Sequence, residues 1–245
     1  MNKSLEKGLL IVIESGSDAS FKETQTKLLY EKLVSEGYKV EKISFPNYES
    51  PSSALVKMYL GGEFSKNPMD VDPKISSTFY AVDRYASYMT HWKKLLDEGY
   101  IVIADRYTTS NMVHQAGKLD GKEQEEFLNW LYDYEYNLFK LPIPDEVIFL
   151  NMLPKVSQYF ISKRENKIDG SNKKDIHESN KEYLNKCYNS SLGLVDKYNW
   201  TKVNCTFDNI NHLLDDINDD NIRQIVKSKE VIANEIYSHI SKLLK

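Results

Sequence analysis

Residues 9–23 read LLIVIESGSDASFKE, an apolar run followed by a small polar loop and the start of a helix-like segment. The loop matches part of the phosphate-binding pattern G-x-x-x-x-G-K-[ST], in which backbone N–H groups surround phosphates, the lysine reaches the terminal phosphates and the hydroxyl holds Mg²⁺. Gly16 and Lys22 keep the first glycine and the lysine, whereas Phe21 and Glu23 replace the second glycine and the hydroxyl residue. Because the loop lies at a strand-to-helix junction, we interpret it as an altered nucleotide-binding loop. Its predicted contacts are Gly16, Ser17, Asp18, Ala19, Ser20, Lys22, Glu23 and Thr24.

Length and composition narrow the class of protein. The 245 residues are 41% hydrophobic, which suits one domain spanning residues 1–245 with a buried core. A formal net charge of -4 gives no general attraction for nucleic acid or for an anionic membrane. The two cysteines, Cys187 and Cys205, have neither a metal-ligand nor a redox spacing, and residues 9–13 are too few for a signal-peptide core. We therefore expect a soluble cytoplasmic protein with no nucleic-acid or membrane partner.

Short apolar runs alternate with longer amphipathic segments along the chain. This alternation is typical of β-α-β crossovers and predicts an α/β protein with a parallel sheet. The strand candidates are Leu9 to Ile13, Lys39 to Phe45, Tyr100 to Ala104, Glu146 to Leu150 and Trp200 to Cys205.

Unusual polar sequences begin where three of these strands end. They are residues 14–22, Phe45-Pro46 and Asp105-Arg106. In parallel sheets, ligands bind at the carboxyl ends of the strands, so we expect the three segments to meet at one pocket. Taken alone, an Asp-Arg pair at a strand end is equally compatible with a helix cap and an ion pair.

Three other segments have a distinct composition. Residues 163–178 read KRENKIDGSNKKDIHE, a basic run broken by Gly, Ser and Asn, which alone is compatible with a solvated loop. Residues 207–221 are rich in Asn and Asp and predict a surface turn. Apolar residues with helical spacing over about residues 223–244 predict a C-terminal packing helix.

Four motifs follow one another in a fixed order. They are Glu14 with Ser17-Asp18-Ala19-Ser20 and Lys22, then Phe45-Pro46, then Phe79-Tyr80-Ala81-Val82-Asp83-Arg84, and then Asp105-Arg106-Tyr107-Thr108-Thr109-Ser110 with Gln115. The Asp-Arg-Tyr-x-x-Ser element, five residues before the glutamine, is the most discriminating of them. With these motifs, spread from residue 9 to about residue 190, the chain resembles the thymidylate kinases. The resemblance implies a three-layer P-loop kinase fold with a five-stranded parallel sheet flanked by helices.

The resemblance also implies an activity and its catalytic groups. The family transfers the ATP γ-phosphate to dTMP, giving dTDP for dTTP synthesis, and uses ATP and Mg²⁺. Such a transfer needs two anions held in line and the charge between them neutralised. By resemblance, Lys22 would meet the donor phosphates, Arg106 would bind the acceptor phosphate in a bidentate pair, and Asp105 would help to hold Mg²⁺. The basic run would be a lid over about residues 163–178, with Arg164 stabilising the transition state.

The acceptor nucleotide would be bound by the middle motifs. Tyr80 would stack on thymine, while Arg84 and Gln115 would contact its polar edge. Tyr107 would lie near the sugar and bar a 2′-hydroxyl, and Ser110 would support the phosphate or the loop. Phe45 and Pro46 complete the predicted substrate contacts. Because the chain has 17 tyrosines, an aromatic near residue 80 could equally be core packing.

Three departures from the family pattern keep the functional prediction open. Phe21 stands where a glycine avoids the Cβ penalty of a left-handed backbone, and its ring could fill phosphate space. Glu23 adds a negative charge near an anion, and Asn151 stands where the family commonly has aspartate. We therefore weigh a thymidylate kinase against a non-catalytic homologue that binds a thymidine nucleotide or a protein partner, and against a kinase for another nucleoside or monophosphate. We read His177, near the end of the lid segment, as structural, and the resemblance suggests a homodimer.

Overall fold

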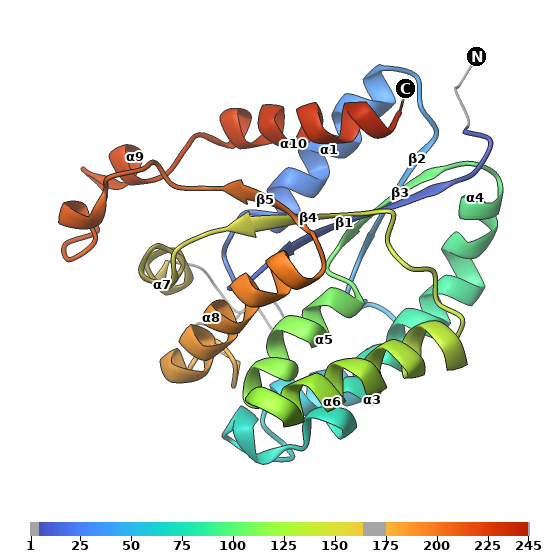
Figure 1. Cartoon of the computed structure of the whole chain (residues 1–245), viewed down its shortest axis with the longest axis horizontal. Helices are drawn as coiled ribbons and strands as arrows, with labels where there is room; N and C mark the ends of the chain where they lie inside the picture. The colour runs from blue at the N-terminus through green and yellow to red at the C-terminus, as the bar shows by residue number, and fades with distance from the viewer. Residues whose placement is uncertain (1–4, 164–174, 245) are drawn as a thin grey trace.

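The computed structural model describes residues 5–163 and 175–244, and their centre is a five-stranded sheet. All neighbouring strands run parallel, in the order β2-β3-β1-β4-β5. The strands are β1 (Leu9–Ser15), β2 (Val40–Ser44), β3 (Ile101–Asp105), β4 (Glu146–Asn151) and β5 (Thr201–Asn204). The five strand predictions and the parallel α/β sheet are thus confirmed (Figure 1).

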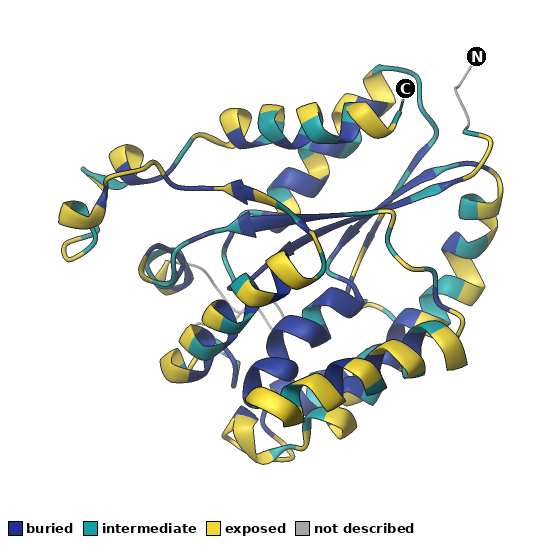
Figure 2. Ribbon diagram, viewed as in Figure 1, coloured by how far each residue is buried: buried dark blue, intermediate teal, exposed yellow. Residues whose placement is uncertain are grey.

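Alternating side chains of β1 create two apolar cores, one on each face of the sheet. Leu10 and Val12 pack into one core, while Ile11 and Ile13 pack into the other, because successive strand residues point to opposite faces. Helices α1 (Lys22–Ser35) and α10 (Lys229–Leu243) cover the second face, and α5 (Thr108–His114), α6 (Gly121–Tyr132) and α8 (Lys181–Lys197) cover the first. The helices are buried towards the sheet and exposed on their outer sides (Figure 2). The result is the predicted three-layer arrangement.

Further helices complete the described chain. Asp72 caps α3 (Pro73–Ser87) because its carboxylate accepts hydrogen bonds from the backbone N–H groups of Lys74 and Ile75. The remaining helical segments are η1 (Pro51–Ser53), α2 (Ala54–Leu60), η2 (Pro68–Asp70), η3 (Tyr88–Trp92), α4 (Lys93–Asp97), η4 (Ala116–Lys118), η5 (Asp133–Leu138), α7 (Pro154–Ser162), η6 (Asn211–Leu213) and α9 (Ile222–Ile225).

The C-terminal segment differs from its prediction. The single helix expected over about residues 223–244 is wrong, because α9 ends at Ile225 and α10 begins only at Lys229. Between them, Val226 adopts an extended backbone and forms an antiparallel bridge with Thr206. The Ser228 hydroxyl then accepts from the N–H of Val231 and starts α10. Helical spacing of apolar residues did not reveal this interruption.

Residues 207–221 form turns and the short helix η6, as the Asn-rich and Asp-rich composition predicted. One side chain of this stretch, Ile210, is nevertheless buried in the core under α10, so the segment also closes one end of the sheet. Across the two described stretches of chain, no helix combines the length and apolarity needed to span a bilayer.

Candidate active site

A cavity of about 870 Å³ opens at the carboxyl ends of the central strands. The loop after β1, residues 42–46 at the end of β2, and Asp105-Arg106 at the end of β3 all line it. The predicted meeting of three strand ends is therefore confirmed. Helices α3 and α5 and residues 175–178 close its far side.

The loop after β1 contains two non-glycine residues with left-handed backbone. They are Ala19, with φ of 52°, and Phe21, with φ of 66°. Each L-residue in this region pays a steric cost that glycine avoids. Phe21 also packs its ring edge-on against Phe160 of α7, with centroids 5.1 Å apart. Phe21 also lines the cavity, and the expectation that its ring could fill phosphate space stays a prediction.

Gly16, the first glycine of the phosphate-binding pattern, packs directly against α8. A Cβ at this position would lie 2.5 Å from the Ser191 hydroxyl and 3.1 Å from the Tyr188 ring. The first glycine of the pattern is thus required by close packing, whereas the second glycine position tolerates an aromatic residue.

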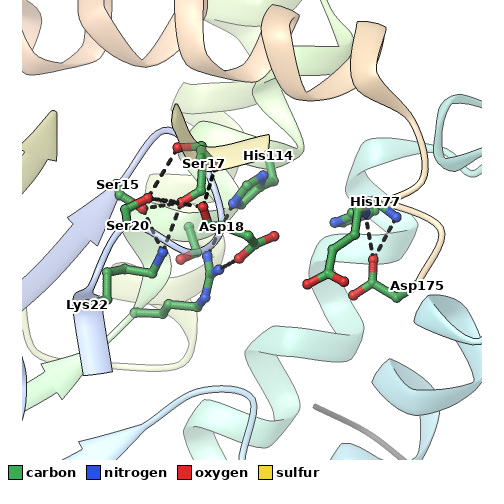
Figure 3. A network of polar contacts seen from close by, with 12 residues as sticks. Ser15, Ser17, Asp18, Ser20, Lys22, His114, Asp175 and His177 are labelled. Atoms are coloured by element: carbon green, nitrogen blue, oxygen red, sulfur yellow. Dashed lines mark hydrogen bonds and ion pairs between the residues drawn. The ribbon is translucent and has the colours of Figure 1, made fainter. Parts of the chain in front are cut away.

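Lys22 points back into its own loop (Figure 3). Its Nζ donates to the Ser15 hydroxyl at 2.6 Å and to the Ser17 carbonyl at 3.2 Å. The same carbonyl also accepts from the hydroxyls of Ser15 and Ser20. Burial, helped by the positive charge of Arg106, lowers the pKa of Lys22 to about 8. The ammonium is thus a buried donor at the head of the cavity.

Arg106 connects the loop with the acceptor side of the cavity. It has a left-handed backbone (φ 69°) and forms an ion pair with Asp18, and its Nη1 lies 3.2 Å from His114 Nε2. Burial acts to lower the pKa of its guanidinium, but Asp18, Glu14 and Asp105 raise it above the ordinary value. Arg106 is therefore a permanent cation held in one position.

Glu14 supports this arrangement from the end of β1. Its carboxylate accepts from the Ser15 N–H at 2.9 Å, the Thr109 hydroxyl at 2.7 Å and the Ser110 hydroxyl at 2.6 Å. Arg106 Nη1 lies 3.9 Å from the same carboxylate. Ser110 thus bonds to Glu14 at the end of β1, and its predicted support of the phosphate or of the loop stays a prediction. Sequence reasoning missed Thr109, which has no signal beyond its place beside Ser110.

His114 is a buried residue that sequence reasoning also missed. Because Arg106 can only donate, His114 Nε2 must accept and Nδ1 must carry the proton. Nδ1 is buried and has no hydrogen-bond partner among the described residues. Burial and the Arg106 charge lower the pKa of His114 to about 4, so the ring is neutral near pH 7. Its position between the Asp-Arg element and Gln115 was the available signal.

Tyr80 and Gln115 lie on the α3 and α5 side of the cavity, here called the acceptor wall, and their contacts with a base stay predictions. Both line the cavity, and Tyr80 packs edge-on against Tyr59 with ring centroids 6.3 Å apart. The Gln115 Oε1 accepts from the Ser76 hydroxyl at 2.6 Å. Phe45 and Pro46 also line the cavity and are joined by a cis peptide bond.

Arg84 lies at the cavity but is paired within the protein. Its Nε and Nη2 donate to the two carboxylate oxygens of Glu135 at 2.7 and 2.5 Å, and its Nη1 donates to the Tyr107 carbonyl at 3.4 Å. Arg84 is 1% exposed and Glu135 is fully buried. Arg84 is thus held by a bidentate buried ion pair, and its contact with a base stays a prediction.

Tyr107 is likewise bonded within the protein. Its ring lines the cavity between Phe45 and Trp92, but it is fully buried and its hydroxyl donates to the Pro142 carbonyl at 3.0 Å. The hydroxyl is therefore engaged within the protein, while Tyr107 remains part of the cavity lining. The expectation that its ring bars a 2′-hydroxyl stays a prediction.

Residues 175–178 lie across the acceptor side. Asp175 accepts from the N–H groups of His177 and Glu178, and burial together with the charge of Asp18 raises its pKa to about 7. His177 Nε2 lies 3.0 Å from the Tyr59 hydroxyl, and burial holds the pKa of His177 well below its usual range. A buried neutral imidazole fits the structural role expected for His177.

The predicted lid is described only at its two ends. Lys163 lines the cavity and forms an ion pair with Asp219. Arg164, together with residues 165–174, lies outside the described residues.

Asp105 is the carboxylate predicted to help hold Mg²⁺. It is 8% exposed at the end of β3 and lines the cavity, and its charge acts to raise the pKa of Lys22 against the larger lowering caused by burial. Within residues 5–163 and 175–244, no three His, Cys, Asp or Glu side chains gather as a metal site. One carboxylate fits Mg²⁺, which is usually held by one or two carboxylates together with waters and nucleotide phosphates.

The sheet order 2-3-1-4-5, the phosphate-binding loop after β1 and the Asp-Arg pair at the end of β3 define a P-loop nucleoside monophosphate kinase, a phosphotransferase class. A family model described as thymidylate kinase matches residues 14–217. The chain belongs to the thymidylate kinase family.

Individual relatives agree with this assignment. The chain is 28% identical to a thymidylate kinase of Plasmodium falciparum over 229 residues, which cover 94% of this chain and 95% of the relative. It is 29% identical to a human thymidylate kinase over 147 residues, covering 60% and 62% of the two chains. A thymidylate kinase structure from Candida albicans aligns with a TM-score of 0.63 at 21% identity, over 96% of this chain and 92% of that one, and this likeness shows the fold.

Proposed function

We propose that the protein transfers the γ-phosphoryl group of ATP to dTMP. The observation that carries the proposal is the position of Arg106, a permanent cation paired with Asp18 of the loop on one side and hydrogen-bonded to His114 of the acceptor side on the other. A phosphoryl group that moves from the donor to the acceptor nucleotide would pass between the loop and the acceptor side, where Arg106 lies. A guanidinium at that place neutralises the charge of the phosphoryl group.

The chain supplies both halves of the site. Lys22, on the loop side, would exchange its bonds to Ser15 and Ser17 for donor phosphate oxygens. Tyr80 and Gln115 would receive the base of the acceptor nucleotide, with the edge of Tyr80 fixed by Tyr59. We propose that Mg²⁺ binds at Asp105, where it would neutralise charge on the donor phosphates.

A second candidate function rests on the loop itself. In this structure Lys22 is engaged with the Ser17 carbonyl, and Phe21 and Ala19 occupy left-handed backbone positions. A homologue that binds a thymidine nucleotide without turnover would retain the acceptor wall and tolerate such a loop. The two candidates share the acceptor site and differ only in donor binding and transfer.

We also propose a homodimer in a cytoplasmic setting. The support for the dimer is an apolar stripe along α3 and η3, where Ile75, Val82 and Met89 recur every seven residues and are 54%, 40% and 51% exposed. A second copy would cover this stripe. Light scattering of the wild type and of Val82→Asp tests it, since a dimer that the charged variant reduces to a monomer is expected. The compartment remains a prediction from composition.

Separate titrations with dTMP and with ATP·Mg²⁺ test the two half-sites. We expect dTMP to bind and to raise the melting temperature, because it binds the folded state selectively, and we expect ADP to form when both nucleotides are present. Saturating dTMP that gives neither a binding heat nor a thermal shift would contradict the acceptor site. Binding of dTMP with no ADP formation would favour the non-catalytic candidate.

A further inference from the structure

A buried hydroxyl on α3 fixes the orientation of the Gln115 side chain. Ser76 is fully buried and Gln115 is 1% exposed, and the Ser76 Oγ lies 2.6 Å from the Gln115 Oε1. The two residues are 39 positions apart in sequence, so the contact joins the helix of Tyr80 to the end of α5. Nothing in the family motifs points to Ser76.

The distance decides which end of the amide faces the hydroxyl. At 2.6 Å the contact lies in the range of O–H···O hydrogen bonds and below that of N–H···O bonds. An amide oxygen carries no hydrogen, so the Ser76 hydroxyl must be the donor. The backbone carbonyls of Asp72 and Pro73 lie farther from the same Oγ, at 3.0 and 3.3 Å.

The Gln115 oxygen is bonded to Ser76, so the amino group is the part of the amide that can bond to a ligand. The Tyr59 hydroxyl near the acceptor wall is already engaged, since it lies 3.0 Å from His177 Nε2 and accepts from Lys118 Nζ at 3.2 Å. The amino group of Gln115 has two hydrogens to donate. Because Gln115 lines the cavity, this amino group is the end of the amide that remains for a ligand.

We propose that Ser76 is a specificity-determining residue that makes Gln115 a hydrogen-bond donor towards the acceptor base. A donor at this position selects a base with a carbonyl oxygen on the facing edge, such as a 4-oxo pyrimidine. It disfavours a 4-amino pyrimidine, whose amino group would meet another donor. This inference rests on the proposed function, since it assumes that the acceptor base lies against Gln115.

The test compares the dissociation constants of dTMP, dUMP and dCMP by calorimetry. We expect the wild type to prefer dTMP and dUMP over dCMP, and Ser76→Ala to reduce that preference by about tenfold, because the freed amide can rotate to present its oxygen. Gln115→Glu should reverse the preference towards dCMP, since Ser76 would hold one carboxylate oxygen and the other would accept. The ratio of constants is the readout because it is insensitive to a general loss of affinity.

Ser77→Ala is the matched control. Ser77 is a fully buried serine on the same helix, and its hydroxyl has no partner among the described residues. We expect it to leave the dTMP to dCMP ratio unchanged. An unchanged ratio in both Ser76→Ala and Gln115→Glu, with dTMP still bound, would overturn the role of Ser76 and leave the proposed function intact. A wild type that binds none of the three nucleotides would overturn the proposed function as well.

Discussion

The two sides of the cavity hold their charged groups by different means. On the donor side, groups within the loop after β1 hydrogen-bond to one another. The Ser17 carbonyl accepts from Lys22, Ser15 and Ser20. In the same loop, Phe21 has a left-handed backbone. On the acceptor side, side chains from separate elements bind one another, as Ser76 does with Gln115. The donor loop must therefore exchange internal bonds when phosphates bind, whereas the acceptor wall is already oriented.

Arg106 contacts both the donor loop and the acceptor side, so its substitution should lower kcat/KM more than any other substitution proposed here. We expect Arg106→Lys to lower kcat/KM by about tenfold to a hundredfold, since loss of a charge-assisted hydrogen bond costs about 1.5–3 kcal/mol and lysine cannot form the bidentate pair. Lysine keeps the positive charge beside Asp18 and Glu14, so the melting temperature should change little. Steady-state kinetics and thermal unfolding of the two proteins make the comparison.

Alanine at position 106 is the less informative variant. It would leave the carboxylates of Asp18 and Glu14 without their cation, and breaking a buried ion pair is strongly destabilising. A rate loss confined to Arg106→Ala, with Arg106→Lys fully active, would show that Arg106 supplies only charge for folding. Arg106 would then have no role in transfer between the donor loop and the acceptor wall.

The acceptor wall should also show a characteristic pH dependence through His114. The folded state lowers the pKa of His114 from 6.5 to about 4, so between these values the unfolded chain binds more protons and acidification lowers the free energy of unfolding. His114→Gln keeps an acceptor for Arg106 and does not titrate. From pH 6.5 to pH 4 we expect the wild type to lose about 1–3 kcal/mol more stability than this variant, measured by urea unfolding.

Other groups titrate in the same range and are shared by both proteins. Asp175 acts with the opposite sign, because its pKa is raised to about 7 and the folded state binds the extra proton as the pH falls. The difference in stability between the wild type and His114→Gln cancels the contribution of groups such as Asp175 that titrate in both proteins. Equal acid sensitivity of the wild type and His114→Gln would show that His114 is not buried and neutral as described. The charged groups that act on His114 are Arg106, Asp18, Glu14 and Lys22.

The sheet and the meeting of three strand ends could be predicted from the sequence because they depend on local patterns. Apolar runs such as residues 9–13 reveal strands, and a parallel sheet brings their carboxyl ends together. The break between α9 and α10 could not be predicted in this way, since it depends on the bridge between Val226 and Thr206. Residues in a non-local bridge leave no periodic signal.

The sequence motifs predicted which residues line the cavity, but they did not predict the hydrogen-bond partners of those residues. The Tyr80 and Arg84 spacing predicted two base contacts, but Arg84 meets Glu135, a residue 51 positions away that no motif contains. Tyr107 likewise turns its hydroxyl to the Pro142 carbonyl. A buried polar group takes the partner that folding supplies, and sequence spacing does not show that partner.

Glu23 tests the donor side directly. Replacing it with threonine removes a negative charge from the first turn of α1 and restores the hydroxyl of the phosphate-binding pattern. We expect Glu23→Thr to bind ATP·Mg²⁺ about three- to tenfold more tightly, by calorimetry, with dTMP affinity unchanged. Glu31→Thr, on an exposed position of the same helix, is the control for a charge change alone. Equal affinities in all three proteins would mean that Glu23 does not face the donor phosphates.

The smallest expected effect concerns the left-handed backbone of Phe21. Phe21→Gly and Phe21→Ala both remove the ring contact with Phe160, so their difference isolates the backbone. At a right-handed helical position alanine is more stable than glycine, but at φ of 66° the Cβ of alanine is penalised. We therefore expect Phe21→Gly to be more stable than Phe21→Ala by about 1 kcal/mol in urea unfolding. The reverse order would place the residue outside the left-handed region and would remove backbone strain from the description of the donor loop.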